Sequence, residues 1–228
     1  MTEIWQGFVE AVKLIISFDP EVMEIAGRSL MISGTACLLA SLICLPLGSF
    51  IHFHNFRGKR ALTNVIQTLF SVPTVIVGLF VFVLFSQAGL FGASGILFTP
   101  VVMVIGQMIL ISPVMLGLTI SALSGVNKEL VDTATSLGAS GRQIAVAVIR
   151  EARFAIVAAL IMGFGRAISE VGCALMVGGN IRGVTRVMTT AISLETSKGE
   201  LVLSIALGII LLSLALIISI ALNRIQQR

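Results

Sequence analysis

The stretch ALTNVIQTLFSVPTVIVGLFVFVLFSQAGLFGASGILFTPVVMVIGQMILISPVMLGLTISALSGVN (61–127) decides the fold, because it carries no charged residue. A transmembrane helix needs only ~20 predominantly apolar residues, so a stretch of this length must hold two spans and a turn. We place the turn at 87–100, where residues that break helices gather: Gly89, Gly92, Gly95 and Pro100. The two spans are predicted at 62–86 and 100–121.

Three further stretches repeat this pattern. Residues 29–56 and 201–223 are uncharged, and 154–181 carries only Arg166 and Glu170. The runs are continuous rather than alternating, and each is longer than the ~9–11 residues of a barrel strand. The sequence therefore predicts an all-α integral membrane protein with five transmembrane helices. The three spans added here are 29–51, 154–177 and 201–222.

The composition excludes most soluble classes. Hydrophobic residues make up 57% of the 228 residues and charged residues 11%, with a mean hydropathy of +1.07. Soluble domains have ~45–50% apolar and ~25% charged residues. Soluble enzymes and nucleic-acid-binding modules are therefore excluded. The three cysteines form no CxxC pair, and His52 and His54 diverge on a helix at a spacing of two, so we expect no metal site.

The distribution of Lys and Arg predicts the orientation in the cytoplasmic (inner) membrane. One side collects nine cations: Arg57, Lys59, Arg60, Lys128, Arg142, Arg150, Arg153, Arg224 and Arg228. The other side has five: Lys13, Arg28, Arg182, Arg186 and Lys198. The side richer in cations is normally cytoplasmic. We therefore expect a multi-pass protein with its N-terminus outside, its C-terminus in the cytoplasm and a cytoplasmic loop at 122–153.

Residues 1–18 have the pattern of an amphipathic helix, with polar residues at spacings of three and four and Trp5 as an anchor. Such a helix lies at the membrane interface in contact with lipid, or packs on the bundle, and the pattern leaves both open. Asp19, Pro20 and Glu21 then read as an N-cap, a first-turn proline and a first-turn acid. A new helix begins there and continues into the first span, so we assign 20–223 to the membrane domain.

The segment SGVNKELVDTATSLGASGRQIAVAVIREARF (124–154) makes the long loop (122–153) unlike the others. Asn127 suits the cap of a helix over 128–137, and Gly138 suits the left-handed position that ends it. Ser140 and Gln143 make a capping-box pattern for a second helix. A helix–Gly–helix unit in a cytoplasmic loop serves either as a docking element or as a structured connector.

Within that unit, Asp132-Thr133-Ala134 and Leu137-Gly138-Ala139 resemble the EAA loop of importer-type ABC permeases. In that family an acid, two small residues and a glycine six positions after the acid form a short helix that fits a cleft on the ATPase subunit. This sequence has Asp132 in place of Glu and Thr133 in place of Ala, and the family's later Leu-Pro is replaced. The resemblance implies the five-helix core of a type I ABC importer. It also implies an ATPase-docking loop formed by Glu129, Asp132, Thr133, Ala134, Leu137, Gly138 and Ala139.

A second resemblance lies in GRAISEVGCALMVGGNIRGVTRVMTTAISLETSKGE (165–200), which is similar to the permeases of molybdate and tungstate importers, most of all the tungstate-type members. It implies a transport subunit that moves an oxyanion. It also implies a second copy of the chain, two ATPase subunits that carry ATP and magnesium, and an extracytoplasmic substrate-binding protein. The chain has no GxxxxGK[ST] phosphate loop, so we expect no cofactor on it and no enzymatic activity of its own.

Ionisable and polar residues near spans 4 and 5 are candidates for the pathway or its gate: Arg166, Glu170, Asn180, Arg182, Thr185 and Arg186. Arg166 and Glu170 are four apart, so on a continuous helix they face the same side and can pair. They line the pathway or form a structural pair. Arg182 and Arg186 repeat that spacing and offer cations to an oxyanion or to an acidic docking surface, or extend outward at the interface.

Two other classes are weighed against an ABC permease. A gradient-driven secondary transporter predicts inverted repeats and a charged relay within the membrane, and neither is evident in the sequence. A membrane anchor has no need of the helix–Gly–helix loop. Among ABC permeases, those for sulfate or phosphate remain alternatives, because charge gives only the sign of the cargo. The outer end before the last span shows a modest excess of positive charge.

Overall fold

The computed structural model describes residues 2–226, and within them the regular structure is helical. The α-helices in chain order are α1 (Thr2–Ile16), α2 (Pro20–Phe53), α3 (Lys59–Thr68), α4 (Thr74–Phe85), α5 (Pro100–Ser124), α6 (Lys128–Ser136), α7 (Gly141–Glu151), α8 (Arg153–Ile168), α9 (Gly172–Gly178), α10 (Met188–Lys198) and α11 (Leu201–Gln226). Two 3-10 turns, η1 (Leu69–Ser71) and η2 (Gly92–Ser94), lie before and after α4. Met1 and the predicted tail cation Arg228 fall outside the described residues.

Three helices, α2, α5 and α11, are long and apolar enough to cross a membrane by themselves. The other two predicted spans are bent pairs: α3 with η1 meets α4 at 97°, and α8 meets α9 at 57°. Counting each pair as one span gives five. The prediction of continuous helices over 62–86 and 154–177 is therefore wrong in detail. Pro73 explains the first break, because it cannot donate a backbone hydrogen bond and it holds Val72 extended.

The start of α2 confirms the predicted cap. The Asp19 carboxylate accepts hydrogen bonds from the backbone N–H groups of Glu21 (3.1 Å) and Val22 (3.0 Å), and Pro20 occupies the first turn. The helix then continues without interruption to Phe53. The first span therefore extends well beyond the charge-free stretch that predicted it.

The centre of the bundle is held together by small residues on facing helices. Gly48 of α2 lies so close to α5 that an added Cβ would be 2.9 Å from the Thr119 Cγ2. Gly163 of α8 lies equally close to Met115 of α5, with 2.9 Å between an added Cβ and the Met115 Cγ. Such close approach of backbones is how membrane helices gain packing energy without a hydrophobic driving force between them.

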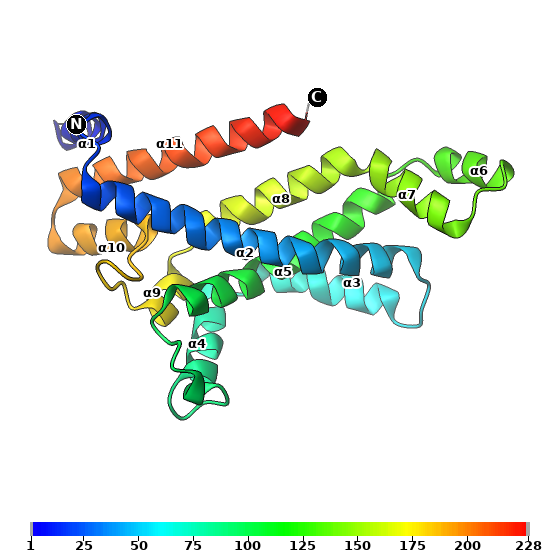
Figure 1. The fold of residues 1–228 in the computed structure, drawn as a ribbon, viewed down its shortest axis with the longest axis horizontal. Helices are drawn as coiled ribbons and strands as arrows, with labels where there is room; N and C mark the ends of the chain where they lie inside the picture. The colour runs from blue at the N-terminus through cyan, green and yellow to red at the C-terminus, as the bar shows by residue number, and fades with distance from the viewer. Residues whose placement is uncertain (1, 227–228) are drawn as a thin grey trace.

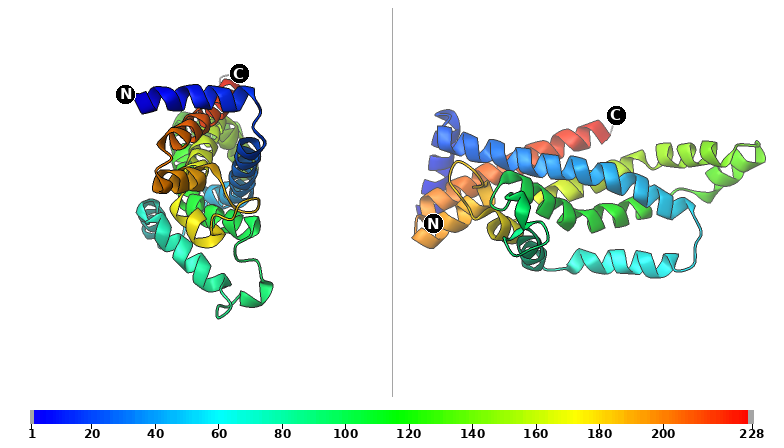
Figure 2. Two further views of the ribbon diagram at one scale, coloured as in Figure 1. Left: turned by 90° about the vertical axis from the view of Figure 1, so that its left-hand side faces the viewer. Right: turned by 60° about the horizontal axis from the view of Figure 1, so that its bottom comes forward.

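The two ends of the bundle differ (Figure 1). Helices α1 and α10 lie at one end, whereas α6 and α7 extend from the other, and α4 leaves the bundle sideways. Helix α1 lies across α11 (Figure 2) and buries Gly7 and Ala11 against it. An added Cβ at Gly7 would be 2.5 Å from the Ile205 Cγ2. Helix α1 therefore packs on the bundle with one face, while Trp5 remains exposed on its other side, and its predicted place at the membrane interface stays a prediction.

Candidate functional site

The long loop folds as its caps predict. The Asn127 side-chain oxygen accepts from the Glu129 N–H at 3.1 Å and caps α6. Helix α6 ends at Ser136, and Gly138, two residues later, has a φ of 78° in the left-handed region that favours glycine. The Gln143 side-chain oxygen accepts from the Ser140 N–H at 2.7 Å and starts α7. These local bonds give the helix–Gly–helix unit a defined shape at the free end of the bundle (Figure 1).

One side of this unit is anchored and the other is free. Leu130 and Val131 pack against a buried cluster formed by Leu123, Val148 and Ala152, where α5, α7 and α8 meet. The residues of the EAA-like motif face away from that cluster. Five of the predicted docking residues are exposed and two are half-buried: Glu129, Asp132, Thr133, Leu137 and Gly138, with Ala134 and Ala139.

Leu137 is the clearest sign of an unoccupied contact surface, because 82% of this large apolar side chain is exposed. A groove of about 540 Å³ lies along α7, with Leu130 of α6 in its wall. Its lining combines apolar and charged or polar residues: Leu130, Arg142, Gln143, Val146, Ala147, Arg150 and Glu151. An exposed apolar surface with a polar rim is typical of a protein–protein contact.

The predicted pairing of Arg166 with Glu170 is wrong. Helix α8 ends at Ile168, so the two residues do not share a helical face. The Glu170 carboxylate instead accepts from the Cys173 N–H at 2.7 Å and caps α9. The Thr189 hydroxyl donates to the Glu170 backbone oxygen at 2.7 Å, which fixes the break in span 4.

Arg166 is left without a counter-ion among residues 2–226. Its Nε atom is buried and has no hydrogen-bond partner within the described chain. Glu170, by contrast, is 5% exposed, and its carboxylate accepts the hydrogen bond from the Cys173 N–H at the start of α9. Separate placement of these two groups means that the positive charge of Arg166 is not neutralised by the carboxylate four residues away.

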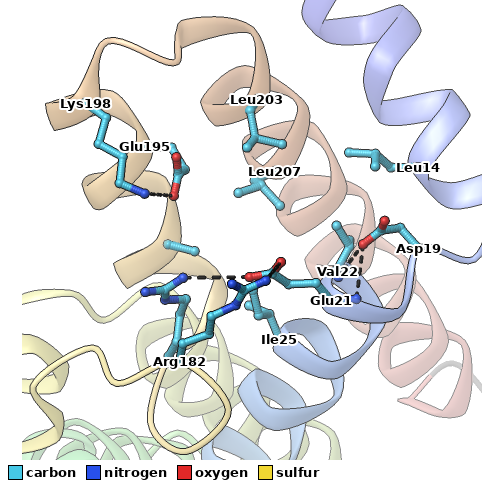
Figure 3. Close-up of a pocket in the computed structure, with 12 residues that line it drawn as sticks. Leu14, Asp19, Glu21, Val22, Ile25, Arg182, Glu195, Lys198, Leu203 and Leu207 are labelled. Atoms are coloured by element: carbon cyan, nitrogen blue, oxygen red, sulfur yellow. Dashed lines mark hydrogen bonds and ion pairs between the residues drawn. The ribbon is translucent and has the colours of Figure 1, made fainter.

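At the opposite end, Arg182 and Arg186 meet a carboxylate that sequence reasoning did not connect with them. The Arg182 Nη2 lies 2.5 Å and the Arg186 Nη1 3.7 Å from the two oxygens of Glu21 at the start of α2 (Figure 3). Arg28 donates to the Arg186 backbone oxygen at 3.0 Å and also pairs with Glu24. The two arginines therefore tie the loop before α10 to α2.

Asn180 and Thr185 hold that loop from within. The Thr185 hydroxyl donates to the Gly178 oxygen at 2.5 Å and accepts from the Ile181 N–H at 2.9 Å, and its side chain is fully buried. The Asn180 amide donates to the Thr190 oxygen at 3.2 Å. The loop is not helical, so the spacing of four residues does not place the two arginines on one helical face. Both polar side chains support the loop through these hydrogen bonds, and the Asn180 Oδ1 atom is buried without a partner in the described chain.

A pocket of about 340 Å³ lies beside these arginines (Figure 3). Its charged lining is balanced: Asp19, Glu21 and Glu195 against Arg182, Arg186 and Lys198. Glu195 pairs with Lys198 at 2.9 Å. The excess of positive charge predicted for this end is therefore offset by carboxylates of α2 that lie far away in the sequence.

The described chain offers no alternative chemistry at either end. No group of three His, Cys, Asp or Glu side chains in residues 2–226 is placed to hold a metal ion. The cysteines at 37, 44 and 173 are free thiols inside the bundle. Among the described residues, the features that stand out are the exposed long loop, the unpaired Arg166 and the ion-paired loop before α10.

Comparison with known proteins adds a family and several relatives. The model of the family described as binding-protein-dependent transport system inner membrane component matches residues 44–228. The tungstate uptake system permease protein TupB of Peptoclostridium acidaminophilum is 40% identical over 227 residues and covers 100% of both chains. A probable anion ABC transporter permease protein of Haloferax volcanii is 42% identical over 200 residues, 86% of each chain.

Solved structures share the architecture at lower identity. A chain of the MetNI methionine ABC transporter in an inward-facing conformation aligns with a TM-score of 0.73 at 17% identity, covering 91% of this chain and 95% of that one. A chain of a bacterial ABC transporter that imports alginate aligns with a TM-score of 0.73 at 19% identity, covering 95% and 82%.

Proposed function

Because the chain belongs to the binding-protein-dependent transport system inner membrane components, we propose that it is the permease subunit of an ABC importer for tungstate or the closely similar molybdate. Support for this cargo comes from the similarity to tungstate uptake permeases, which extends over the whole chain in the Peptoclostridium protein and over 98% of it, at 36% identity, in that of Campylobacter jejuni. The chain is a transport subunit rather than an enzyme.

One structural observation carries the choice of an anion as cargo. Arg166 lies near the outer end of α8 without a carboxylate partner in the described residues. A cation at membrane depth costs roughly 2.5–3.5 kcal/mol on insertion scales, so a position without a counter-ion calls for a functional reason. A cargo anion that passes Arg166 supplies the missing charge transiently. A permanently paired arginine has little attraction left for a cargo.

Energy for transport comes from a partner in this proposal. Two ATPase subunits bind ATP and magnesium, and each docks on the long loop (122–153) of one copy of this chain through α6 and the exposed Leu137. This orientation requires the loop and the C-terminus to be cytoplasmic and α1 to be outside. The membrane domain of each copy, 20–223, borders a shared pathway on the two-fold axis.

The outer loop is assigned to docking rather than to substrate contact. Arg182 is 72% exposed at its side chain although it is paired with Glu21. Exposed ion pairs of this kind contribute little to stability, so they are free to exchange partners. An acidic patch on an extracytoplasmic substrate-binding protein would compete with Glu21 for the two arginines. That protein, not this chain, then provides the affinity for the cargo.

The proposal is tested by uptake. Cells that lack this chain are compared with cells carrying the natural chain or Arg166→Gln, and tungsten, molybdenum, sulfur and phosphorus uptake are measured by mass spectrometry. We expect tungstate and molybdate uptake to require the natural chain and to fall at least tenfold in Arg166→Gln. The matched control Arg166→Lys keeps the charge and should retain most uptake. Loss of sulfate or phosphate uptake alone would reassign the cargo.

A sulfate transport system permease of Escherichia coli is 22% identical over 217 residues, which makes sulfate the second candidate cargo.

The same cells separate the ABC mechanism from a gradient-driven one. Uptake that persists when the partner ATPase is inactivated, but stops when the membrane potential is removed, would exclude an ABC importer for any cargo.

A further inference from the structure

Helix α3 and the η1 turn that follows it have three different faces: one buried against the bundle, one exposed and apolar, and one exposed and polar. Ile66 and Phe70 face the bundle. Exposed apolar side chains, Val65 and Leu69, follow on a second face. The third face is exposed and polar: Arg60, Asn64, Gln67 and Ser71, at spacings of four, three and four. These spacings place the four residues on one side of the helix.

This polar face extends inward along the bundle from the end of α5. Helix α3 runs antiparallel to α5, on the outside of the bundle (Figure 2), and Phe70 contacts Gly117 of α5. Gly117 lies seven residues before Ser124, where α5 ends, which is about 10 Å along a helix. The Asn64, Gln67 and Ser71 side chains have no hydrogen-bond partner in the described chain. Lipid cannot supply one, so the face requires water or polar groups.

The arrangement around α5 shows where this face points. Three helices approach α5: α8 at Met115, α2 at Thr119 and α3 at Gly117. With about 100° between successive residues, the contacts with α8 and α2 lie about 40° apart, and the contact with α3 lies on the far side of α5. The side of α5 between its contacts with α3 and α8, turned away from α2, stays uncovered. That side carries the half-buried Val114 and Leu118 and the exposed Ser121.

Arg166 and the polar face of α3 both turn toward this uncovered side. On α8, Gly163 contacts α5, and Leu160 faces Cys37 of α2. Arg166 is rotated from Gly163 by about 60° in the direction away from Leu160, hence away from α2. Helix α3 runs antiparallel to α5. The positions of Asn64 and Gln67 around α3 therefore also direct them to the gap between α3 and α8, beside the uncovered side of α5.

The charge of this gap suits an anion. No Asp or Glu occurs between Glu24 and Glu129, so α3, α4 and α5 contribute no negative side chain. Arg166 lies toward the outer end of α8, and Arg60 lies at the cytoplasmic end of α3. Between these two cations the polar face provides amide and hydroxyl donors, which can hydrogen-bond an oxyanion without holding it tightly.

We infer that the polar face of α3 lines the cytoplasmic half of the transport pathway and donates hydrogen bonds to a hydrated tetrahedral oxyanion between Arg166 and Arg60. The cargo in this inference rests on the proposed function. The water-filled lining is argued from the exposure and position of Asn64, Gln67 and Ser71 and requires no particular cargo.

The test uses single cysteines in the full transporter, with the three native cysteines replaced. Asn64→Cys and Gln67→Cys probe the polar face, and Val65→Cys and Leu69→Cys are matched controls on the apolar face of the same helix. An anionic methanethiosulfonate reagent with a sulfonate group is applied from the cytoplasmic side and compared with its trimethylammonium analogue. We expect the polar-face cysteines to react at least tenfold faster than the controls, and faster with the anionic reagent.

Cargo and function provide the second readout. Tungstate should slow the labelling of Gln67→Cys at least threefold, and completed labelling should stop uptake. Equal labelling of the two faces, or disulfide cross-linking between copies at Asn64→Cys without labelling, would overturn the inference in favour of a protein contact. A polar-face labelling pattern without protection by tungstate or molybdate would keep the water-filled lining and reject the proposed cargo.

Discussion

Thr185→Val tests whether the outer loop is held by internal hydrogen bonds or serves the cargo. Valine has the shape of threonine, so no cavity forms, but it removes one donor and one acceptor. The Gly178 oxygen and the Ile181 N–H then lose the partners that lie at 2.5 and 2.9 Å in the natural chain. A buried polar group without a partner costs about 1–3 kcal/mol, and the carbonyl is the more deeply buried of the two. We expect a loss of about 2–3 kcal/mol.

The assay is equilibrium unfolding of the purified chain in mixed micelles, with Thr185→Ser as the matched control. Serine keeps both hydrogen bonds and loses only a methyl group, worth roughly 1 kcal/mol. Thr185→Val should therefore be the less stable variant, while uptake per folded molecule stays near that of the natural chain. Equal stability of the Val and natural chains would refute the role of these hydrogen bonds, and lost uptake without lost stability would indicate that the hydroxyl contacts the cargo instead.

Gly138→Val should weaken ATPase co-purification roughly 5–30-fold, since a left-handed φ costs ~1–2 kcal/mol for a residue with a side chain, whereas Gly138→Asn should retain it. No atom of this chain lies within 4 Å of an added Cβ there. An equal loss of co-purification in both variants would therefore indicate that the added side chain clashes with the ATPase. Glu21→Gln should change stability by less than ~1 kcal/mol yet tighten salt-sensitive binding of the substrate-binding protein, because it frees the exposed Arg182. Single cysteines at Ser94 and Ser140 should be labelled from opposite sides of the membrane; labelling from one side would refute the topology.

The parts of the fold that sequence predicts well are those determined by neighbouring residues. Asp19 and Asn127 cap helices two or three residues away, and Gly138 ends a helix through its own backbone. The charge-free stretches likewise report local polarity, which the membrane requires along each span. Such signals are present in a short window of sequence, so they can be read without knowledge of the tertiary structure.

The missed features depend on contacts between distant segments. Arg182 and its partner Glu21 are 161 residues apart, and nothing local to either one indicates the pair. The wrong pairing of Arg166 with Glu170 came from assuming a continuous helix through a break. One signal was available: Thr63, Asn64, Gln67, Thr68 and Ser71 make an unusually polar stretch inside a predicted span.

The two clusters of arginine have opposite electrostatic states, and this difference assigns them different roles. Arg182 and Arg186 share Glu21 at the solvent-exposed end, where their field is largely neutralised. Arg166 has no such partner within residues 2–226, and its buried Nε atom has no hydrogen-bond partner there. In the proposed function, attraction for a dianion is therefore concentrated at Arg166 and is weak at the ion-paired loop before α10, so a separate substrate-binding protein would collect the cargo.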